Sequence, residues 1–194
     1  LEPSLTQALS HAAAAVELIH AYSLVHDDLP CMDDDVMRRG KPTLHIAYGE
    51  SLALLAADAM QPLAFEQLSN MPVAPALIVQ AIQVLARASG SLGMVGGQVI
   101  DTQNTDQIIS IDKLQQMHRL KTGAMIEGSV LMGAICAAAN FETRNALEAY
   151  GAAIGLAFQV VDDILDVTAD SQELGKTAGK DAQNNKPTYV SIMG

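Results

Sequence analysis

The chain has 194 residues and a formal net charge of -11; apolar residues make up 49% of it and aromatic residues only 4%. Its length suits one domain with a sizeable core, and its charge argues against general binding to nucleic acids or to anionic membranes. Many of the apolar residues are Ala, Leu or Met, which are good helix formers, so the composition predicts an all-α protein.

The first predicted element is an apolar helix near the N-terminus. Residues 1–10 are predicted to form a turn that leads into this helix, with Ser4 as the N-cap. Residues 11–26 are apolar almost all the way round, which is typical of a buried helix rather than a surface helix. Pro30 disrupts the helix a few residues later.

An acidic run follows this helix directly. Five aspartates occupy the nine positions from Asp27 to Asp35, and Arg38, Arg39 and Gly40 come next. Carboxylates this close together repel one another unless water or cations neutralise them. Mg2+ is usually held by one or two carboxylates and by substrate phosphates, and a guanidinium matches phosphate oxygens in pairs. The run therefore indicates a metal and diphosphate site, although taken alone it could also be a solvated loop.

The middle of the chain is predicted to consist of helices joined by turns, without strand-like alternation. Residues 39–43 form a turn by composition. Residues 44–68 are predicted to form one or two helices, with Gly49 and Pro62 as weak points, and residues 76–88 are predicted to form another.

A segment rich in Gly and small residues occupies positions 90–97. It lacks the Gly-x-x-x-x-Gly-Lys-Ser/Thr pattern of a phosphate-binding loop, and no strand precedes it, so we expect close packing between helices there. Gln98 and Asp101 lie one turn apart just after it.

A long helical stretch is predicted for residues 112–139, with Asp112 as its cap. Lys121 and Thr122 lie within it, before a small, apolar face. A lysine at such a position could simply extend its ammonium group to solvent.

A second acidic cluster lies near the end of the last long helix, which is predicted for residues 144–167. Asp162 and Asp166 are four residues apart, so both project from one face, and Asp163 lies between them. The helix dipole disfavours anions at this end, so these acids need a compensating cation or exposure to water. Chance poorly explains two apolar helices that both end in aspartate pairs. Two carboxylate sets across a bundle cavity would form a multi-metal site for a diphosphate.

Residues 174–187 carry several Gly and Lys residues, including Lys176 and Lys186. The segment could be an ordinary surface loop. Beside an acidic metal site it would serve as a lid that brings cations to bound phosphates and excludes water.

The sequence also bears on location. Cys31 and Cys136 are far apart and form no Cys-x-x-Cys pair, so a reduced, cytoplasmic protein is the simplest interpretation. The longest apolar run, residues 130–139, is too short to cross a bilayer, and no signal peptide is visible. We therefore expect no stable membrane insertion.

Taken together, these motifs resemble those of the trans-isoprenyl diphosphate synthases, specifically the bacterial-type farnesyl diphosphate synthases. Residues 26–33 resemble the longer form, DDxxxxD, of the first aspartate-rich motif, and residues 38–40 resemble the Arg-Arg-Gly that follows it. Residues 158–166 resemble the second motif. Residues 96–101 and 121–122 match two further signatures in the right order, so the resemblance covers essentially the whole chain.

This resemblance implies an all-α, isoprenoid-synthase-type helical bundle around a central apolar cavity, normally a homodimer. Residues 1–194 would be the central portion of a single polyprenyl synthetase domain, with its N- and C-terminal parts absent. The N-terminal Gly-Lys-Arg segment and the histidine with which the family binds isopentenyl diphosphate do not occur here. About three Mg2+ ions would bind with the diphosphate. The metal ligands would be Asp27, Asp33 and Asp162, supported by Asp28, Asp163 and Asp166.

The resemblance also implies roles for the polar residues around the metal. The residues contacting the allylic diphosphate would be Arg38, Lys121, Gln159 and Lys176, and Arg39 would bind isopentenyl diphosphate. Thr122 and Gln159 would help to stabilise the allylic cation. Lys186 would belong to the closing C-terminal segment, and Gln98 and Asp101 would support the metal and the lysine.

The length of the product would be set by what blocks the cavity before the first motif. Tyr22 lies about one and a half helical turns before Asp27, with Ser23 beside it. A bulky aromatic there resembles the pattern of enzymes that make a C15 product, although Tyr22 could also be an ordinary core residue.

The function implied is Mg-dependent condensation of isopentenyl diphosphate with dimethylallyl or geranyl diphosphate to farnesyl diphosphate. Geranylgeranyl diphosphate synthase is an alternative function, and Tyr22 is the only residue that argues against it. A terpene cyclase would normally lack the second aspartate-rich motif. A non-catalytic partner subunit would be expected to have lost acidic residues, and here both motifs are intact.

Overall fold

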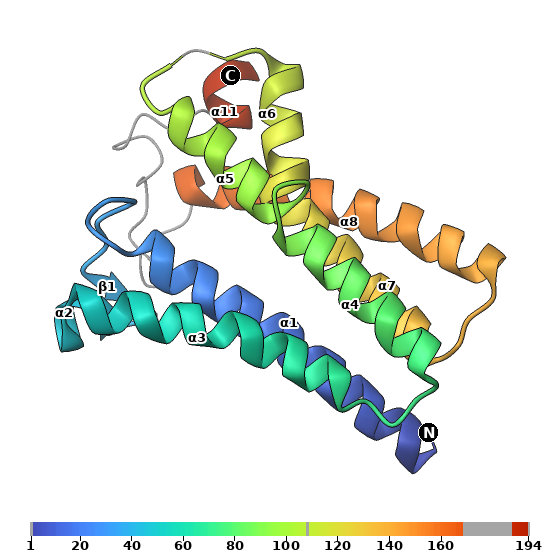
Figure 1. Cartoon of the computed structure of the whole chain (residues 1–194). Coiled ribbons are helices and arrows are strands. Elements are labelled where there is room, and N and C mark those ends of the chain that lie inside the picture. Colours follow the sequence, from blue (N-terminus) through green and yellow to red (C-terminus); the bar gives the residue numbers. More distant parts are fainter. Residues whose placement is uncertain (1, 108, 169–187, 194) are drawn as a thin grey trace. The chain divides into compact units, whose positions relative to one another are not determined.

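The protein is almost entirely helical, which confirms the all-α prediction. Figure 1 shows the computed structural model, which describes residues 2–107, 109–168 and 188–193. The helices in chain order are α1 (Pro3–Asp27), α2 (Leu44–Tyr48), α3 (Glu50–Ser69), α4 (Pro75–Ser89), α5 (Met94–Gln103), α6 (Ile111–His118), the π-helix η1 (Arg119–Gly123), α7 (Ala124–Cys136), α8 (Phe141–Thr168) and α11 (Tyr189–Met193).

The chain forms two compact units. The first comprises residues 1–84 and 132–139, and the second comprises residues 85–131 and 140–194. In the first unit α1 and α3 run side by side (Figure 1). Both helices bury alanines, whose small side chains allow a close approach of the backbones. The buried alanines of these two helices are Ala8, Ala12, Ala15, Ala53, Ala57 and Ala64.

In the second unit the π-helix η1 packs against α5, α6 and α8. A Cβ atom on Gly97 of α5 would lie only 2.2 Å from the backbone N of Lys121, and a Cβ on Gly155 of α8 would lie 2.9 Å from the Cα of Gly123. Only glycine fits at these two positions. The prediction that the Gly-rich segment serves close helix packing is therefore confirmed at Gly97.

Two predicted helix starts are wrong. Glu2 is the N-cap of α1, and Ser4 lies inside the helix, because Pro3 with its fixed φ occupies the first helical turn. Ser110 rather than Asp112 caps α6: its hydroxyl accepts the backbone N–H of Lys113 at 3.3 Å.

The predicted helix over residues 112–139 is also not one regular α-helix, because it contains the π-turn of η1. The predicted stretch 44–68 is broken at Gly49, where φ is 87°, into α2 and α3, whereas Pro62 stays inside α3. The residues predicted as a turn after Arg38 form a short antiparallel hairpin of β1 (Met37–Arg38) and β2 (Lys41–Pro42). Arg39 and Gly40 at its tip have φ values of 51° and 73°.

Two helical stretches, Pro3–Asp27 and Pro75–Gln103, are long and apolar enough by length and composition to cross a membrane. The run at residues 130–139 is not one of them. Core helices of soluble proteins meet the same criterion, and so does a signal sequence near the N-terminus, so two such helices are weak evidence for a membrane span.

Candidate functional site

The acidic run forms a compact loop at the end of α1. The backbone N–H of Asp33 donates to the carbonyl oxygen of Asp27 at 2.9 Å, and the N–H of Asp35 donates to that of Asp28 at 3.2 Å. These bonds turn the chain back immediately after the helix, which ends at Asp27. The loop therefore gathers its carboxylates within a few residues of the helix end rather than spreading them along an extended chain.

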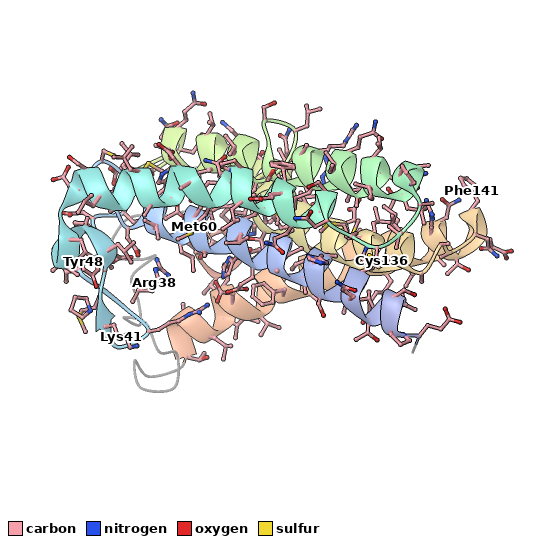
Figure 2. All side chains as sticks on the ribbon, turned by 60° about the horizontal axis from the view of Figure 1, so that its bottom comes forward. Arg38, Lys41, Tyr48, Met60, Cys136 and Phe141 are labelled. Carbon is pink, nitrogen blue, oxygen red and sulfur yellow. The ribbon has the colours of Figure 1, made fainter. Side chains whose placement is uncertain are left out.

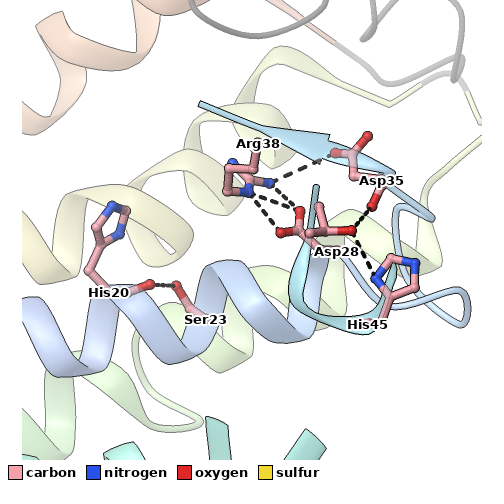
Figure 3. A network of polar contacts seen from close by, with 7 residues as sticks. His20, Ser23, Asp28, Asp35, Arg38 and His45 are labelled. Atoms are coloured by element: carbon pink, nitrogen blue, oxygen red, sulfur yellow. Dashed lines mark hydrogen bonds and ion pairs between the residues drawn. The ribbon is translucent and has the colours of Figure 1, made fainter. Parts of the chain in front are cut away.

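Arg38 of β1 is fixed by Asp28 (Figure 3). Its Nε lies 2.9 and 3.0 Å from the two carboxylate oxygens, and its Nη2 lies 2.6 Å from Oδ1. The hydrogen bonds with Asp28 raise the pKa of the guanidinium, and the charges of Asp27 and Asp33 raise it further. Asp28 itself is only 4% exposed. The guanidinium is thus held in one orientation beside the acidic loop.

Thr43 and His45 extend this network, and sequence reasoning missed both. The Thr43 hydroxyl donates to the carbonyl oxygen of Asp35 at 2.7 Å and lies 3.2 Å from Nδ1 of His45. Because the only hydroxyl proton is used on Asp35, Nδ1 must carry the ring proton and donate to Thr43. Both side chains are buried, and the hydrogen bond from Thr43 holds the end of the acidic loop at Asp35. No motif in the sequence pointed to them, because the hydrogen bond from Thr43 to Asp35 joins residues on either side of the hairpin.

The hairpin carries further positive charge. Arg39 lies at its tip and is exposed, as is Lys41 on β2. Figure 2 shows Arg38, Lys41 and Tyr48 at the same end of the first unit, with Met60 farther along α3. Arginine and lysine side chains on one small hairpin are suited to bind an anion next to the acidic loop.

Tyr22 is buried in α1, and Ser23 is half-buried. The Tyr22 ring packs edge-on against His26, with ring centroids 5.7 Å apart. Burial raises the pKa of the Tyr22 hydroxyl, and the charge of Asp27 raises it further. The Ser23 hydroxyl donates to the carbonyl oxygen of His20 at 2.9 Å. A core tyrosine would be buried in the same way, so the role of Tyr22 in product length stays a prediction.

The second unit brings together Lys121 and Asp101, which are twenty residues apart. The ammonium Nζ of Lys121 lies 2.5 Å from Oδ2 of Asp101, whose side chain is buried. Gln98 lies one turn earlier on α5, and Thr122 follows Lys121 on η1; both are half-buried. π-Helical turns inside α-helices occur frequently at functional sites, and this one carries the two predicted residues.

The predicted residues of α8 differ in exposure. Gln159 and Asp162 are half-buried, whereas Asp163 is only 3% exposed and accepts the backbone N–H of Tyr189 at 2.7 Å. The backbone of Asp166 belongs to the same helix. Lys176 and Lys186 lie outside the described residues.

His118, one turn before Lys121, is a further residue that sequence reasoning missed. Its ring packs against Tyr189 with centroids 5.3 Å apart, and burial lowers its pKa from 6.5 to about 4. The side chain is therefore neutral at physiological pH. The sequence did offer one indication of His118: it lies three residues before Lys121, so the two residues share one face of a helix.

Comparison with known proteins gives the family. A sequence model of the family described as polyprenyl synthetase matches residues 2–194. The chain belongs to the polyprenyl synthetase family. The probable farnesyl diphosphate synthase of Bradyrhizobium diazoefficiens is 48% identical over 190 residues, which are 96% of this chain and 57% of that protein. The chloroplastic geranylgeranyl pyrophosphate synthase 7 of Arabidopsis thaliana is 50% identical over 187 residues, 94% of this chain and 54% of that protein.

A solved structure gives the same result for the fold of this chain. The geranyltransferase of Helicobacter pylori, in complex with magnesium and isoprenyl diphosphate, superimposes with a TM-score of 0.89 at 39% identity, over 95% of this chain and 60% of that one. The isoprenoid-synthase-type fold is thereby confirmed. The chain spans a little over half the length of the curated relatives it matches.

The acidic residues of this chain suit Mg2+. Within the part of the chain that the structure describes, no three His, Cys, Asp or Glu side chains form a ready metal cluster. Mg2+ does not require one, because it usually takes one or two protein carboxylates and completes its shell with water and phosphate oxygens. The hydrogen bond between the backbones of Asp27 and Asp33 places two such donors on one short loop. The donor set therefore fits a magnesium-bound diphosphate.

Proposed function

We propose that this protein is a trans-prenyltransferase that condenses isopentenyl diphosphate with dimethylallyl or geranyl diphosphate, giving farnesyl diphosphate and diphosphate. The observation that carries this proposal is Arg38, which Asp28 holds bidentately at the edge of the acidic loop. A fixed guanidinium beside several carboxylates is an arrangement for a metal-bound diphosphate. The similarity to farnesyl diphosphate synthases over nearly the whole chain supports it.

The reaction breaks the bond between the allylic carbon and its diphosphate oxygen. The new carbon–carbon bond forms between that carbon and the alkene of isopentenyl diphosphate, and a proton then leaves to a base such as the released diphosphate. Asp27, Asp33 and Asp162 would hold Mg2+, which when bound neutralises charge on the leaving diphosphate. Arg38 and Lys121 would add their own charges to the same leaving group.

The remaining residues would position these groups. Asp101 holds the ammonium of Lys121 on the π-helix, so the side chain of Lys121 would already be oriented when the substrate binds. The oxygens of Thr122 and Gln159 would stabilise the allylic cation, and Gln98 would support the lysine. Arg39 at the hairpin tip would bind isopentenyl diphosphate, and Lys176 and Lys186 would contact diphosphate from the segment after α8.

The buried Tyr22 favours a C15 product, because a ring at this point of α1 would stop the growing chain. The 50% identity to a geranylgeranyl pyrophosphate synthase supports the C20 product as the second candidate. We further propose a cytoplasmic homodimer that binds about three Mg2+ ions with diphosphate and that neither binds nucleic acid nor inserts into membranes.

The proposal is tested by incubating the complete protein with Mg2+, isopentenyl diphosphate and dimethylallyl diphosphate and identifying the products by mass spectrometry. We expect farnesyl diphosphate, no product after chelation of Mg2+, and recovery when Mg2+ is restored. Asp27→Ala and Asp162→Ala should each lower turnover by roughly a hundredfold or more, as expected for loss of electrostatic stabilisation of a leaving group. Near-normal turnover of either variant in excess Mg2+ would remove that residue from the metal set.

A further inference from the structure

Two buried rings in the second unit pack against each other where α6 meets α11. His118 is the last residue of α6 and Tyr189 is the first residue of α11, and the two helices lie side by side (Figure 1). The ring centroids are 5.3 Å apart, and the ring planes are tilted by 55°. Each of the two residues is only 7% exposed. The contact is therefore shielded from bulk water.

Two polar atoms of these rings lack a protein partner. Among the residues that the structure describes, neither Nδ1 of His118 nor the phenol oxygen of Tyr189 has a hydrogen-bond partner, and both atoms are buried. The two atoms also make no hydrogen bond with each other, although they belong to neighbouring rings. A buried donor or acceptor that is left unsatisfied costs about 1–3 kcal/mol, and the great majority of buried polar groups have a partner. An ordered partner is therefore expected at this contact.

The protonation states of the two rings define what that partner must offer. Burial raises the pKa of the Tyr189 phenol, and the charge of Asp163 raises it further, so the hydroxyl keeps its proton and can donate. Burial lowers the pKa of His118 to about 4, so its imidazole is neutral and Nδ1 either donates or accepts. The partner therefore has to be able both to donate and to accept.

One water molecule meets this requirement. It can accept from the phenol and donate to Nδ1, or accept from Nδ1 and donate to the phenol oxygen, so either tautomer of His118 accommodates it. Buried waters typically make about 2–4 hydrogen bonds to polar groups that would otherwise be unsatisfied. A cation or an anion is a poor fit, because neither ring carries a charge that would balance a buried ion. An apolar ligand would leave both atoms unsatisfied.

The same contact lies next to the turn that carries Lys121. The π-helix η1 begins at Arg119, the residue after His118, and Lys121 is its third residue. The charges of Asp101, Lys121 and Asp162 all act on the pKa of His118, so the ring lies within electrostatic range of these groups. A His118 ring that is held in one place therefore holds the start of the π-turn.

We propose that His118 and Tyr189 bind one internal water molecule between Nδ1 and the phenol oxygen, and that this bridge positions the π-turn carrying Lys121. The water joins α6 to α11 by hydrogen bonds, next to the apolar cluster around Tyr189. His118 and Tyr189 are positioning residues, because they act on Lys121 through the backbone of η1. The water site does not depend on the proposed function, whereas the effect on Lys121 rests on it.

The first experiment is a double-mutant cycle on thermal unfolding of the complete protein. Tyr189→Phe and His118→Phe each remove a polar end of the bridge and keep an aromatic ring at the contact. Each should lower the unfolding midpoint by about 3–10 °C, because the other polar atom stays buried with its bridge broken. The double variant should lose clearly less than the sum, because both ends of the bridge are gone. Tyr150→Phe, at an exposed tyrosine of α8, is the matched control and should stay within about 2 °C.

The water itself is sought in a high-resolution crystal structure of the unmodified protein. We expect one peak at about 2.5–3.2 Å from both Nδ1 of His118 and the phenol oxygen of Tyr189, and no such peak in the double variant. In solution, Tyr189→Phe should shift the Nδ1 resonance of His118 in 15N NMR spectra, because the phenylalanine ring keeps the packing but not the bridge.

The effect on Lys121 is measured as the affinity for pyrophosphate in the presence of Mg2+, by calorimetry. Tyr189→Phe should weaken this affinity about threefold or more, as expected for coupled positions. In a Lys121→Ala background the same substitution should have no further effect, because the side chain that the bridge positions is gone.

Additive midpoints in the cycle, or a direct hydrogen bond between the two rings with no water peak, would overturn the water site. An equal loss of pyrophosphate affinity with and without the Lys121 side chain would overturn the positioning role. Failure of the unmodified protein to bind pyrophosphate with Mg2+ would instead refute the proposed function, and with it the effect on Lys121. The cycle and the crystal structure would still decide the water site in that case.

Discussion

Gly97 of α5 lies directly against the backbone of η1, and we expect Gly97→Ala to disrupt this packing. The added Cβ would lie 2.2 Å from the N atom of Lys121, 2.5 Å from its Cα and 2.8 Å from the C atom of Leu120. All three are backbone atoms, so no side chain can rotate away, and α5 must move from η1.

The size of these contacts sets the expected loss in the free energy of unfolding of Gly97→Ala. Overpacking a core by one methyl group typically costs about 1–3 kcal/mol, and three backbone contacts this short place Gly97→Ala at about 3 kcal/mol or above. In a chain of this size 1 kcal/mol corresponds to about 2–4 °C, so the unfolding midpoint should fall by about 6–12 °C. The displacement would also move Lys121 away from Asp101, and the affinity for pyrophosphate should fall with it.

The assay is thermal unfolding followed by far-ultraviolet circular dichroism, with Gly133→Ala as the matched control. Gly133 lies inside α7, and an added Cβ would meet no atom within 4 Å. Alanine is the better helix former by about 0.5–1 kcal/mol, so this control should unfold at a slightly higher temperature. Equal midpoints for the two variants would refute the packing argument at Gly97.

Three further outcomes are expected. His118, with a pKa lowered to about 4 by burial, stays neutral in the folded state while the unfolded chain takes up a proton below pH 6.5, so about 2–3 kcal/mol of stability present above pH 6.5 should be lost as the pH falls towards 4. Denaturant unfolding across this pH range should show a flatter dependence in His118→Phe; an identical slope would contradict the argument. Arg38→Lys keeps the charge but loses the two-pronged contact with Asp28, so pyrophosphate affinity in calorimetry should fall about tenfold, and unchanged affinity would count against Arg38 as a ligand. Tyr22→Ala should shift the product towards C20 in mass spectrometry and lower stability by about 3–4 kcal/mol, whereas an unchanged C15 product would exclude Tyr22 as the cavity floor.

The sequence by itself determined the helical class and the approximate helix positions, and it predicted a metal site at the acidic motifs. Helical periodicity and Pro or Gly breaks are local signals, so the end of α1 at Asp27 and the break at Gly49 could be predicted from neighbouring residues alone. The residues at which helices begin were harder to predict than the residues at which they end. Ser110 and Asp112 are both good caps, and only the backbone geometry shows which hydroxyl or carboxylate reaches an N–H.

Only the tertiary structure decided what each polar residue contacts. Arg38 and Asp28 are ten residues apart, Lys121 and Asp101 twenty, and Asp163 and Tyr189 twenty-six. Sequence spacing could not show that Asp28 is more deeply buried than Asp27, because both are aspartates at the end of the same helix. Which of them is buried against a partner depends on how the hairpin folds back, and that is fixed by contacts between segments distant in the sequence.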